Sequence, residues 1–258
     1  MVITKNLKQK YALISVFDKK NLRYLCTNLN KYNYKFISTG STGNKIRGMG
    51  FKCRDVSKIT KYKEMFDGRV KTINPLIYSS LLYKRENEFH KKQFLTLKIP
   101  EIDIVIVNLY PFHKYLKRKD INSKIEMIDI GGPTLVRASA KAHSDVLVVT
   151  DPVDYDSILE TLQEANGDPS GVTLSTRQRL ALTAYQRTAA YDVALANILA
   201  TRLESLTEHV EATLPEKLLI SGGEINPLRY GENPHQPAAF YPDNIVGEKP
   251  RGLASAVQ

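Results

Sequence analysis

Runs of apolar residues alternate with stretches of helical periodicity along most of the chain. Aliphatic residues, many of them β-branched, dominate three short runs at 11–17, 102–109 and 146–150, as is typical of strands covered on both faces of a parallel sheet. After the first run, helical spacing places four apolar residues on one stripe, namely Leu22, Leu25, Cys26 and Leu29. This alternation predicts an α/β domain with a doubly wound parallel sheet, in which ligands bind at the carboxyl ends of the strands.

The remaining patterns divide the chain in two. A strand near Phe36 and Ile37 leads into a Ser/Thr/Gly turn at 38–43 and then a second helix, while Asp151-Pro152 suits the start of another. A capping box at 175–178 predicts a long helix to about residue 203, so we place the first domain at 1–203. Residues 204–258 carry several prolines and too few apolar residues for a core of their own, which predicts turns and irregular structure belonging to a truncated second domain.

Charge is distributed unevenly along the chain, whose formal net charge is +10. Residues 1–142 carry 29 Lys and Arg against 11 Asp and Glu, whereas residues 143–258 carry 8 against 16. We interpret the basic half as a solvated surface that attracts phosphate-bearing ligands, and without aromatic stacking motifs it indicates no nucleic-acid partner. The chain has no export signal and no apolar run long enough for a membrane span, so we expect a cytoplasmic protein without a membrane partner. Cys26 and Cys53 lack the paired spacing of a metal site.

Two segments of the first half offer groups for an anionic ligand. The turn at 38–43 stands between a strand and a helix, where backbone N–H groups, hydroxyls and the positive end of the helix converge. The segment Asp67–Thr72 holds two cations, Arg69 and Lys71, at alternate positions, which an extended backbone directs to one face. An ordinary turn and an ordinary basic loop are the alternatives.

Two further segments lie where strands end. Asn108 and Tyr110 follow a buried strand directly, at the edge where ligands bind. Asp129 precedes the Gly-Gly-Pro sequence that opens a helix, on which Arg137 and Lys141 share one face. A carboxylate and a lysine meeting here give either proton-transfer chemistry or a plain ion pair.

The motifs in their order resemble one enzyme family. These are LISVFDK (13–19), STGST (38–42), DVS (55–57), EMFDGRVKT (64–72), IVNLYPF (106–112), IDIGGPTLVRASAKAH (128–143) and LRYGENPHQ (228–236). Together they resemble the bifunctional AICAR transformylase/IMP cyclohydrolase of purine biosynthesis, along essentially the whole chain. The resemblance implies a methylglyoxal-synthase-like α/β domain at 1–203, an N-terminal fragment of a deaminase-like transformylase domain at 204–258, and a homodimer.

The activity implied is the ring closure of formyl-AICAR to IMP. By resemblance, Lys141 is the proton-transfer residue, Asp129 contacts the carboxamide, and Lys71 and Tyr110 support the closing carbonyl. The other implied residues bind the substrate, chiefly its phosphate and base: Phe17, Asp18, Lys19, Thr39, Gly40, Ser41, Thr42, Arg69, Val70, Thr72, Asn108, Leu109, Ile130 and Gly131. The resemblance implies no metal and no cofactor for this step.

The transformylase half is implied only in part. Arg229 and Tyr230 match residues that hold AICAR at the start of that domain, but its catalytic residues and its site for 10-formyltetrahydrofolate would lie beyond Gln258. We therefore expect no formyl transfer from residues 1–258.

Several positions depart from the family pattern. Phe17 stands in place of Ser, Ser41 in place of Gly, Asn74 and Tyr78 in place of two His, and Ala142 in place of Asn. The alternative function is a nucleotide- or phosphate-sensing module of the same fold, which would not need Lys71, Tyr110, Asp129 and Lys141. Methylglyoxal synthase itself would need an Asp/His elimination site that the sequence does not show.

Overall fold

The computed structural model describes residues 9–63, 65–66, 70–109, 125–204, 217, 219–223 and 225–242. The chain forms two compact units, the first made of residues 1–110 and 129–186, the second of residues 111–128 and 187–258. Helix α9 (Leu174–Glu204) passes from the first unit into the second. The domain boundary at residue 203 stays a prediction.

A parallel sheet forms the centre of the first unit. Its five described strands are β1 (Lys10–Val16), β2 (Tyr34–Ser38), β3 (Cys53–Asp55), β4 (Ile104–Asn108) and β5 (Leu147–Val149), in the order β3-β2-β1-β4-β5. Every pairing is parallel, and Val16 at the end of β1 is in register with Asn108 at the end of β4. The order reverses between β1 and β4, so the predicted doubly wound fold is confirmed and these two strands flank its switch point.

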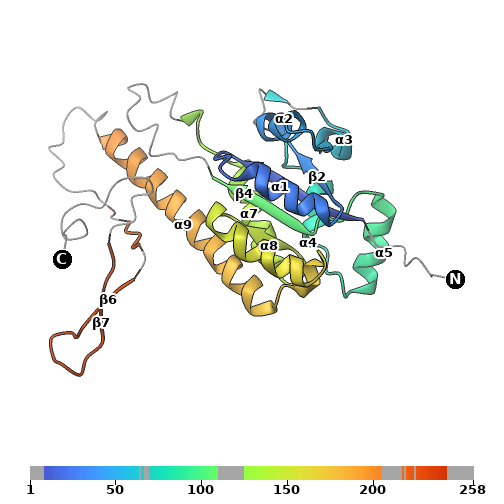
Figure 1. The fold of residues 1–258 in the computed structure, drawn as a ribbon. Helices are drawn as coiled ribbons and strands as arrows, with labels where there is room; N and C mark the ends of the chain where they lie inside the picture. Colours follow the sequence, from blue (N-terminus) through green and yellow to red (C-terminus); the bar gives the residue numbers. More distant parts are fainter. Residues whose placement is uncertain are drawn as a thin grey trace. The chain divides into compact units, whose positions relative to one another are not determined.

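Helices cover both faces of this sheet (Figure 1). The right-handed crossovers expected between parallel strands put α1 (Leu22–Lys31) and α2 (Gly40–Gly48) on one face. There α1 packs against α2 and α8 (Tyr155–Glu164). On the other face α7 (Gly131–Lys141) packs against β4, β5 and α4 (Pro75–Leu82). Because both faces are covered, β4 is buried from Ile104 to Val107, as its uninterrupted aliphatic run predicts.

Three helices between β3 and β4 were not predicted. They are α3 (Ser57–Thr60), α4 and α5 (Glu88–Leu97). An asparagine begins each of the two longer ones, because the side chain of Asn74 accepts a hydrogen bond from Leu76 N–H at 2.9 Å and that of Asn87 from His90 N–H at 3.1 Å. Asn74, a departure from the family pattern, therefore acts as a helix cap.

Charged side chains close the amino-terminal edge of the sheet. Arg85 Nη1 lies 3.0 Å from both Glu101 Oε1 and Asp103 Oδ1, and Nη2 donates to the carbonyl of Ile102 at 2.7 Å. Asp103 also accepts from the N–H of Tyr11 at 2.9 Å. Burial raises the pKa of Asp103, so this carboxylate depends on the groups that pair with it.

The long helix and the last residues differ in detail from the predictions. The predicted capping box at 175–178 is wrong: α9 begins at Leu174, and the hydroxyl of Thr173 accepts from Thr176 N–H at 3.2 Å. In the second unit, β6 (Asn226–Leu228) and β7 (Ala238–Phe240) form a short antiparallel hairpin where we predicted only irregular structure. Two 3₁₀ turns, η3 (Pro152–Asp154) and η4 (Pro169–Gly171), flank α8.

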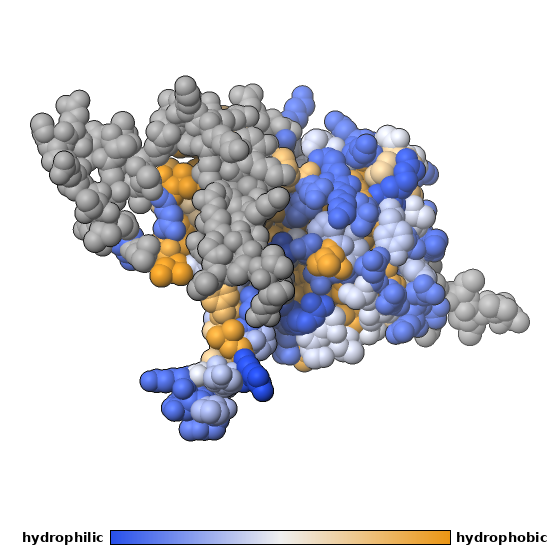
Figure 2. Space-filling view, turned by 60° about the vertical axis from the view of Figure 1, so that its left-hand side comes forward, coloured by the Kyte–Doolittle hydropathy of each residue, from blue (hydrophilic) through white to orange (hydrophobic). Residues whose placement is uncertain are grey.

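The surface of the first unit is mostly hydrophilic in the view of Figure 2, where hydrophobic residues are scattered among polar ones on its right-hand side. Among the described residues no helix combines the length and the apolar character that crossing a bilayer requires. Nor do they contain three or more His, Cys, Asp or Glu side chains grouped to hold a metal ion.

Candidate active site

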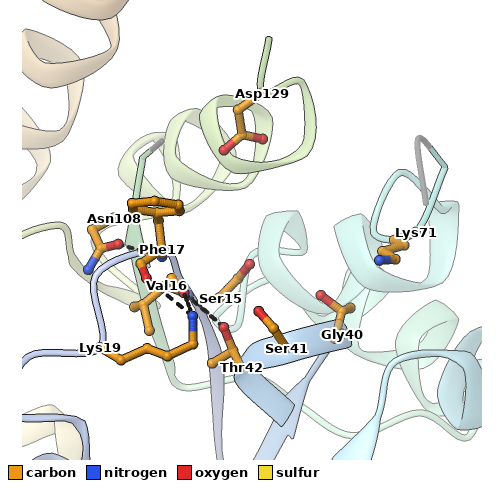
Figure 3. A pocket seen from close by; sticks show the side chains of 11 residues that line it. Ser15, Val16, Phe17, Lys19, Gly40, Ser41, Thr42, Lys71, Asn108 and Asp129 are labelled. Carbon is orange, nitrogen blue, oxygen red and sulfur yellow. Dashed lines mark hydrogen bonds between the residues drawn. The ribbon is translucent and has the colours of Figure 1, made fainter. Parts of the chain in front are cut away.

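A cavity of about 280 Å³ opens at the carboxyl ends of β1, β2 and β4. It lies at the switch point, where the doubly wound topology favours ligand binding. Residues from five separate segments line it: Ser15, Val16, Phe17, Lys19, Thr39, Gly40, Ser41, Thr42, Lys71, Asn108 and Asp129 (Figure 3). We call it the switch-point pocket.

The start of α2 provides one wall of the pocket. The first hydrogen bond of this helix runs from Gly43 N–H to the carbonyl of Thr39, at 3.2 Å. The N–H groups of Gly40, Ser41 and Thr42 come before that bond and point out of the helix end. Backbone donors and the positive helix end together form an environment suited to a phosphate group.

Gly40 has a backbone that only glycine adopts readily. Its φ is +47°, and a Cβ at this position would stand 3.3 Å from Lys71 Nζ. The ammonium group of Lys71 therefore lies against the first residue of α2. Two positive features, a helix N-terminus and a lysine, meet at one side of the pocket, and an anion there would be attracted by both.

A second ammonium group lies on the other side of α2 in Figure 3. Lys19 Nζ donates to the carbonyls of Val16 and Phe17, at 3.3 and 3.2 Å. These bonds hold it over the end of β1, where it lines the pocket together with Thr42. Lys19 and Lys71 thus bring cations to the pocket from different segments of the chain.

Side-chain bonds fix the ends of the two central strands. The hydroxyl of Thr42 donates to the carbonyl of Val16 at 2.9 Å and accepts from its N–H at 3.3 Å, which ties α2 to β1. Asn108, at the end of β4, bonds to the backbone of Phe17 and Asp18. The pocket therefore has a floor held by polar contacts between neighbouring elements.

Asp129 contributes a carboxylate beside the start of α7. Its Oδ1 accepts a hydrogen bond from Gly132 N–H at 2.8 Å. Only glycine fits at position 132, because a Cβ there would lie 2.3 Å from Asp129 Oδ2. Burial raises the pKa of Asp129, while the bond from Gly132 opposes that shift. A carboxyl with a raised pKa is better able to exchange protons near neutral pH.

Comparisons with known proteins agree on one family. Residues 21–134 match the MGS-like domain, and residues 139–258 match the AICARFT/IMPCHase bienzyme family. The bifunctional purine biosynthesis proteins PurH of Cereibacter sphaeroides and Agrobacterium fabrum are 44% and 43% identical to this chain, over 96% and 97% of its length. The chain belongs to the AICARFT/IMPCHase bienzyme family.

Membership of this family confirms the resemblance and the methylglyoxal-synthase-like fold. The chain spans 44% of the length of each of these two PurH relatives, so the activities of the whole relatives are proposals for it. A solved structure, the crystal structure of ForH, superimposes with a TM-score of 0.67 at 30% identity and covers 74% of this chain and 98% of its own.

Many residues that the family resemblance implied line one cavity. Of the implied catalytic residues, Lys71 and Asp129 line the switch-point pocket, while Tyr110 lies outside the described residues. Seven implied substrate-binding residues line it as well: Phe17, Lys19, Thr39, Gly40, Ser41, Thr42 and Asn108. Their roles toward a substrate remain predictions.

Other implied residues lie elsewhere. The side chain of Asp18 accepts from Lys20 N–H at 2.9 Å within its own turn. Thr72 is buried, with its hydroxyl 3.0 Å from the position that a Cβ of Gly131 would take, so it packs against the start of α7. The rest of the described first-unit set is also absent from the lining: Val70, Leu109, Ile130 and Gly131. Arg69 lies outside the described residues, and Arg229 and Tyr230 belong to the second unit.

Lys141 is not part of the pocket of its own chain. It is exposed and ends α7, whose first residue is Gly131, so about 15 Å of helix at 1.5 Å per residue separates it from the end beside Asp129. Within one chain, Lys141 and Asp129 therefore lie at opposite ends of α7.

Ser15 is a pocket residue that the sequence analysis did not select. It is half-buried and the only serine or threonine in β1, next to the strand's last residue. A polar residue interrupting an apolar run just before the carboxyl end of a central strand was the signal that could have found it.

Proposed function

We propose that the switch-point pocket is an IMP cyclohydrolase site, which closes the ring of formyl-AICAR to form IMP in de novo purine biosynthesis. One observation carries this proposal: in a chain of the AICARFT/IMPCHase bienzyme family, a helix N-terminus, two lysines and a half-buried carboxylate line a single cavity. The cationic side suits the ribose phosphate of a nucleotide, and the carboxylate suits proton transfer at its base.

The chemistry of ring closure requires such groups. The carboxamide nitrogen attacks the formyl carbon, and the formyl oxygen leaves as water with two protons, one from each nitrogen that flanks the new carbon centre. An amide nitrogen is a poor nucleophile and hydroxide a poor leaving group. The site must therefore remove a proton, stabilise an oxyanion and return a proton to the departing oxygen.

The described residues divide these tasks. Lys19 and the α2 N–H groups hold the phosphate, and Asp129 exchanges a proton with the carboxamide. Lys71 stabilises the developing oxyanion, together with Tyr110. The formyl group arrives already attached to the substrate, so this reaction needs no metal and no organic cofactor. From the family resemblance, we assign formyl transfer from 10-formyltetrahydrofolate to the part of the relatives that this chain does not match.

Lys141 requires a second copy of the chain. If it serves the same reaction as Asp129, it must come from another protomer, because one α7 separates the two within a chain. We therefore propose a homodimer whose sites are shared. Mixing Asp129→Asn with Lys141→Met, each inactive alone, should restore roughly one quarter of the activity after random exchange of subunits. No recovery from the mixture contradicts sharing, and full activity of Lys141→Met alone removes Lys141 from the mechanism.

The test of the function is IMP formation from formyl-AICAR by the purified chain, followed by ultraviolet absorbance. Asp129→Asn should lower kcat by about 100-fold or more, as expected for loss of an acid–base group. Glu164→Gln, which changes an exposed carboxylate at the end of α8, is the matched control and should leave kcat unchanged.

The alternative is a non-catalytic nucleotide sensor with the same phosphate cradle. It predicts that the unaltered chain binds IMP but forms none from formyl-AICAR, with binding unaffected by Asp129→Asn. Turnover that depends on Asp129 excludes the sensor.

A further inference from the structure

The side chain of Asn108 is occupied by the turn that follows β1. Its Oδ1 accepts from the N–H of Phe17 at 2.6 Å and from the N–H of Asp18 at 2.9 Å. Its Nδ2 donates to the carbonyl of Asp18 at 2.9 Å. A carboxamide has two acceptor lone pairs and two N–H donors, so three of the four bonding positions of Asn108 are used within the protein.

These three bonds cross the switch point of the sheet. Asn108 pairs in register with Val16, the last residue of β1, and its side chain reaches past that rung to the two residues that follow. The strand order reverses between these strands, which leaves their carboxyl ends without a covering crossover. Asn108 thus joins the two strands at the base of the pocket (Figure 3).

The turn that Asn108 holds also determines where Lys19 lies. Lys19 Nζ donates to the carbonyls of Val16 and Phe17, and the N–H of Phe17 is one of the groups bound to Asn108. An ammonium group has three N–H donors, so two bonds to carbonyls leave one for a ligand. The position of that donor depends on the turn keeping its shape.

We propose that Asn108 is a positioning residue, which fixes the Phe17–Asp18 turn so that the ammonium group of Lys19 faces the phosphate of the substrate. This inference rests on the proposed nucleotide site but assigns Asn108 a role different from direct contact with the base. It predicts that loss of Asn108 weakens the hold on the phosphate and does so through Lys19.

A double-mutant cycle tests this dependence, with the affinity for ribose 5-phosphate measured by titration calorimetry. Lys19→Met should weaken binding about tenfold or more, the loss expected for a charged hydrogen bond. Asn108→Ala should weaken it several-fold in the unaltered chain and less than about twofold in the Lys19→Met background. Equal losses from Asn108→Ala in both backgrounds overturn the proposal.

The choice of ligand separates positioning from contact with the base. Ribose 5-phosphate has the phosphate but no base, so a positioning role predicts the same fold-loss for it and for IMP. A loss confined to IMP shows that Asn108 contacts the base and overturns the proposal. Asn108→Asp keeps both acceptors but turns the donor to Asp18 into an oxygen, so it should lose as much affinity as Asn108→Ala.

Asn87→Ala is the control for a general loss of stability. It removes another asparagine whose side chain accepts from a backbone N–H, at the start of α5 and outside the pocket. It should lower stability and leave both affinities unchanged. If the chain forms no IMP yet shows the coupling between Asn108 and Lys19, the proposed function fails and the positioning role stands. Absence of any ribose 5-phosphate binding overturns the positioning role, whereas the proposed function is still decided by IMP formation.

Discussion

Replacing Gly40 with alanine should weaken ligand binding through a single methyl group. Gly40 has a φ of +47°, and its Cβ would come 3.3 Å from Lys71 Nζ at the start of α2. The change therefore does two things: it strains the backbone, and it presses on a lysine that lines the pocket. Lysine has a flexible end, so we expect Lys71 to move away rather than the helix.

The two effects differ in what they change: backbone strain lowers the stability of the fold, and displacement of Lys71 lowers the affinity for the ligand. An L-residue in the left-handed region costs roughly 1–2 kcal/mol. For a chain of this length that corresponds to a fall of roughly 2–8 °C in Tm. Displacing the ammonium of Lys71 by a few tenths of an ångström adds little to this loss of stability but moves a charged donor at the pocket. IMP affinity should therefore fall by up to about tenfold, the loss that corresponds to one charged hydrogen bond of about 1.5 kcal/mol.

Two other glycines provide matched controls. Gly50 has a φ of +91° and Gly48 ends α2, and a Cβ at either meets no atom within 4 Å. Gly50→Ala should therefore lose stability without losing affinity. Gly48→Ala should keep affinity and gain up to about 1 kcal/mol of stability, because alanine suits a helix better than glycine.

Thermal unfolding and calorimetric titration with IMP are the assays. The affinity loss of Gly40→Ala should shrink in a Lys71→Met background, since the group that the methyl displaces is then absent. An unchanged IMP affinity in Gly40→Ala refutes this reasoning, as does an equal loss of affinity in Gly50→Ala.

Three other predictions concern the rest of the first unit. Arg85→Met removes the cation that pairs with Glu101 and Asp103 and should lower the free energy of unfolding in urea by about 3 kcal/mol. Lys91→Met breaks an exposed pair with Glu88 and should lower it by less than about 1 kcal/mol. Equal losses in the two variants would contradict the importance of burial. Burial raises the pKa of Asp129, so the stability that its protonated form gives is present below its ordinary pKa and lost as pH rises through the raised value. Asp129→Asn should therefore gain stability relative to the unaltered chain as the pH rises above about 4, and a difference that stays constant as the pH rises argues against the raised pKa. Thr173→Ala should cost about 1 kcal/mol by removing the cap of α9, and Ser175→Ala should cost clearly less; the reverse order would restore the capping box at 175–178.

The strands were predictable because a strand that is buried on both faces is a nearly continuous run of aliphatic residues in the sequence. β4 is aliphatic from Ile104 to Val107, and β1 is aliphatic from Ala12 to Val16 apart from Ser15. α5 buries a single residue, Phe94, so its pattern has no apolar stripe to recognise. Its start signal is one asparagine, Asn87, and a lone cap does not separate a helix from a turn.

The sequence predicted which segments line the pocket, but not the backbone conformation or the side-chain contacts within it. Carboxyl ends of parallel strands share one edge, so residues 38–42 and 108 were expected to come together, and the family resemblance added residues 17–19. The left-handed backbone of Gly40 and the approach of Lys71 depend on packing between distant segments, which no spacing rule contains. The distance of Lys141 from Asp129 was contained in the sequence, because a helix between them sets about 1.5 Å per residue.

The proposed phosphate site does not require the family's own residues at positions 17 and 41, where this chain has Phe17 and Ser41. The donors at α2 are backbone N–H groups, and the ammonium of Lys19 is held by backbone carbonyls, so neither depends on the side chain at position 17 or 41. The side chains that cannot change are those that shape the backbone: Thr42 ties α2 to β1, and Asn108 ties the turn after β1 to β4. Substitution should therefore be tolerated at Phe17 and Ser41 and costly at Thr42 and Asn108, the reverse of what exposure to the cavity alone would predict.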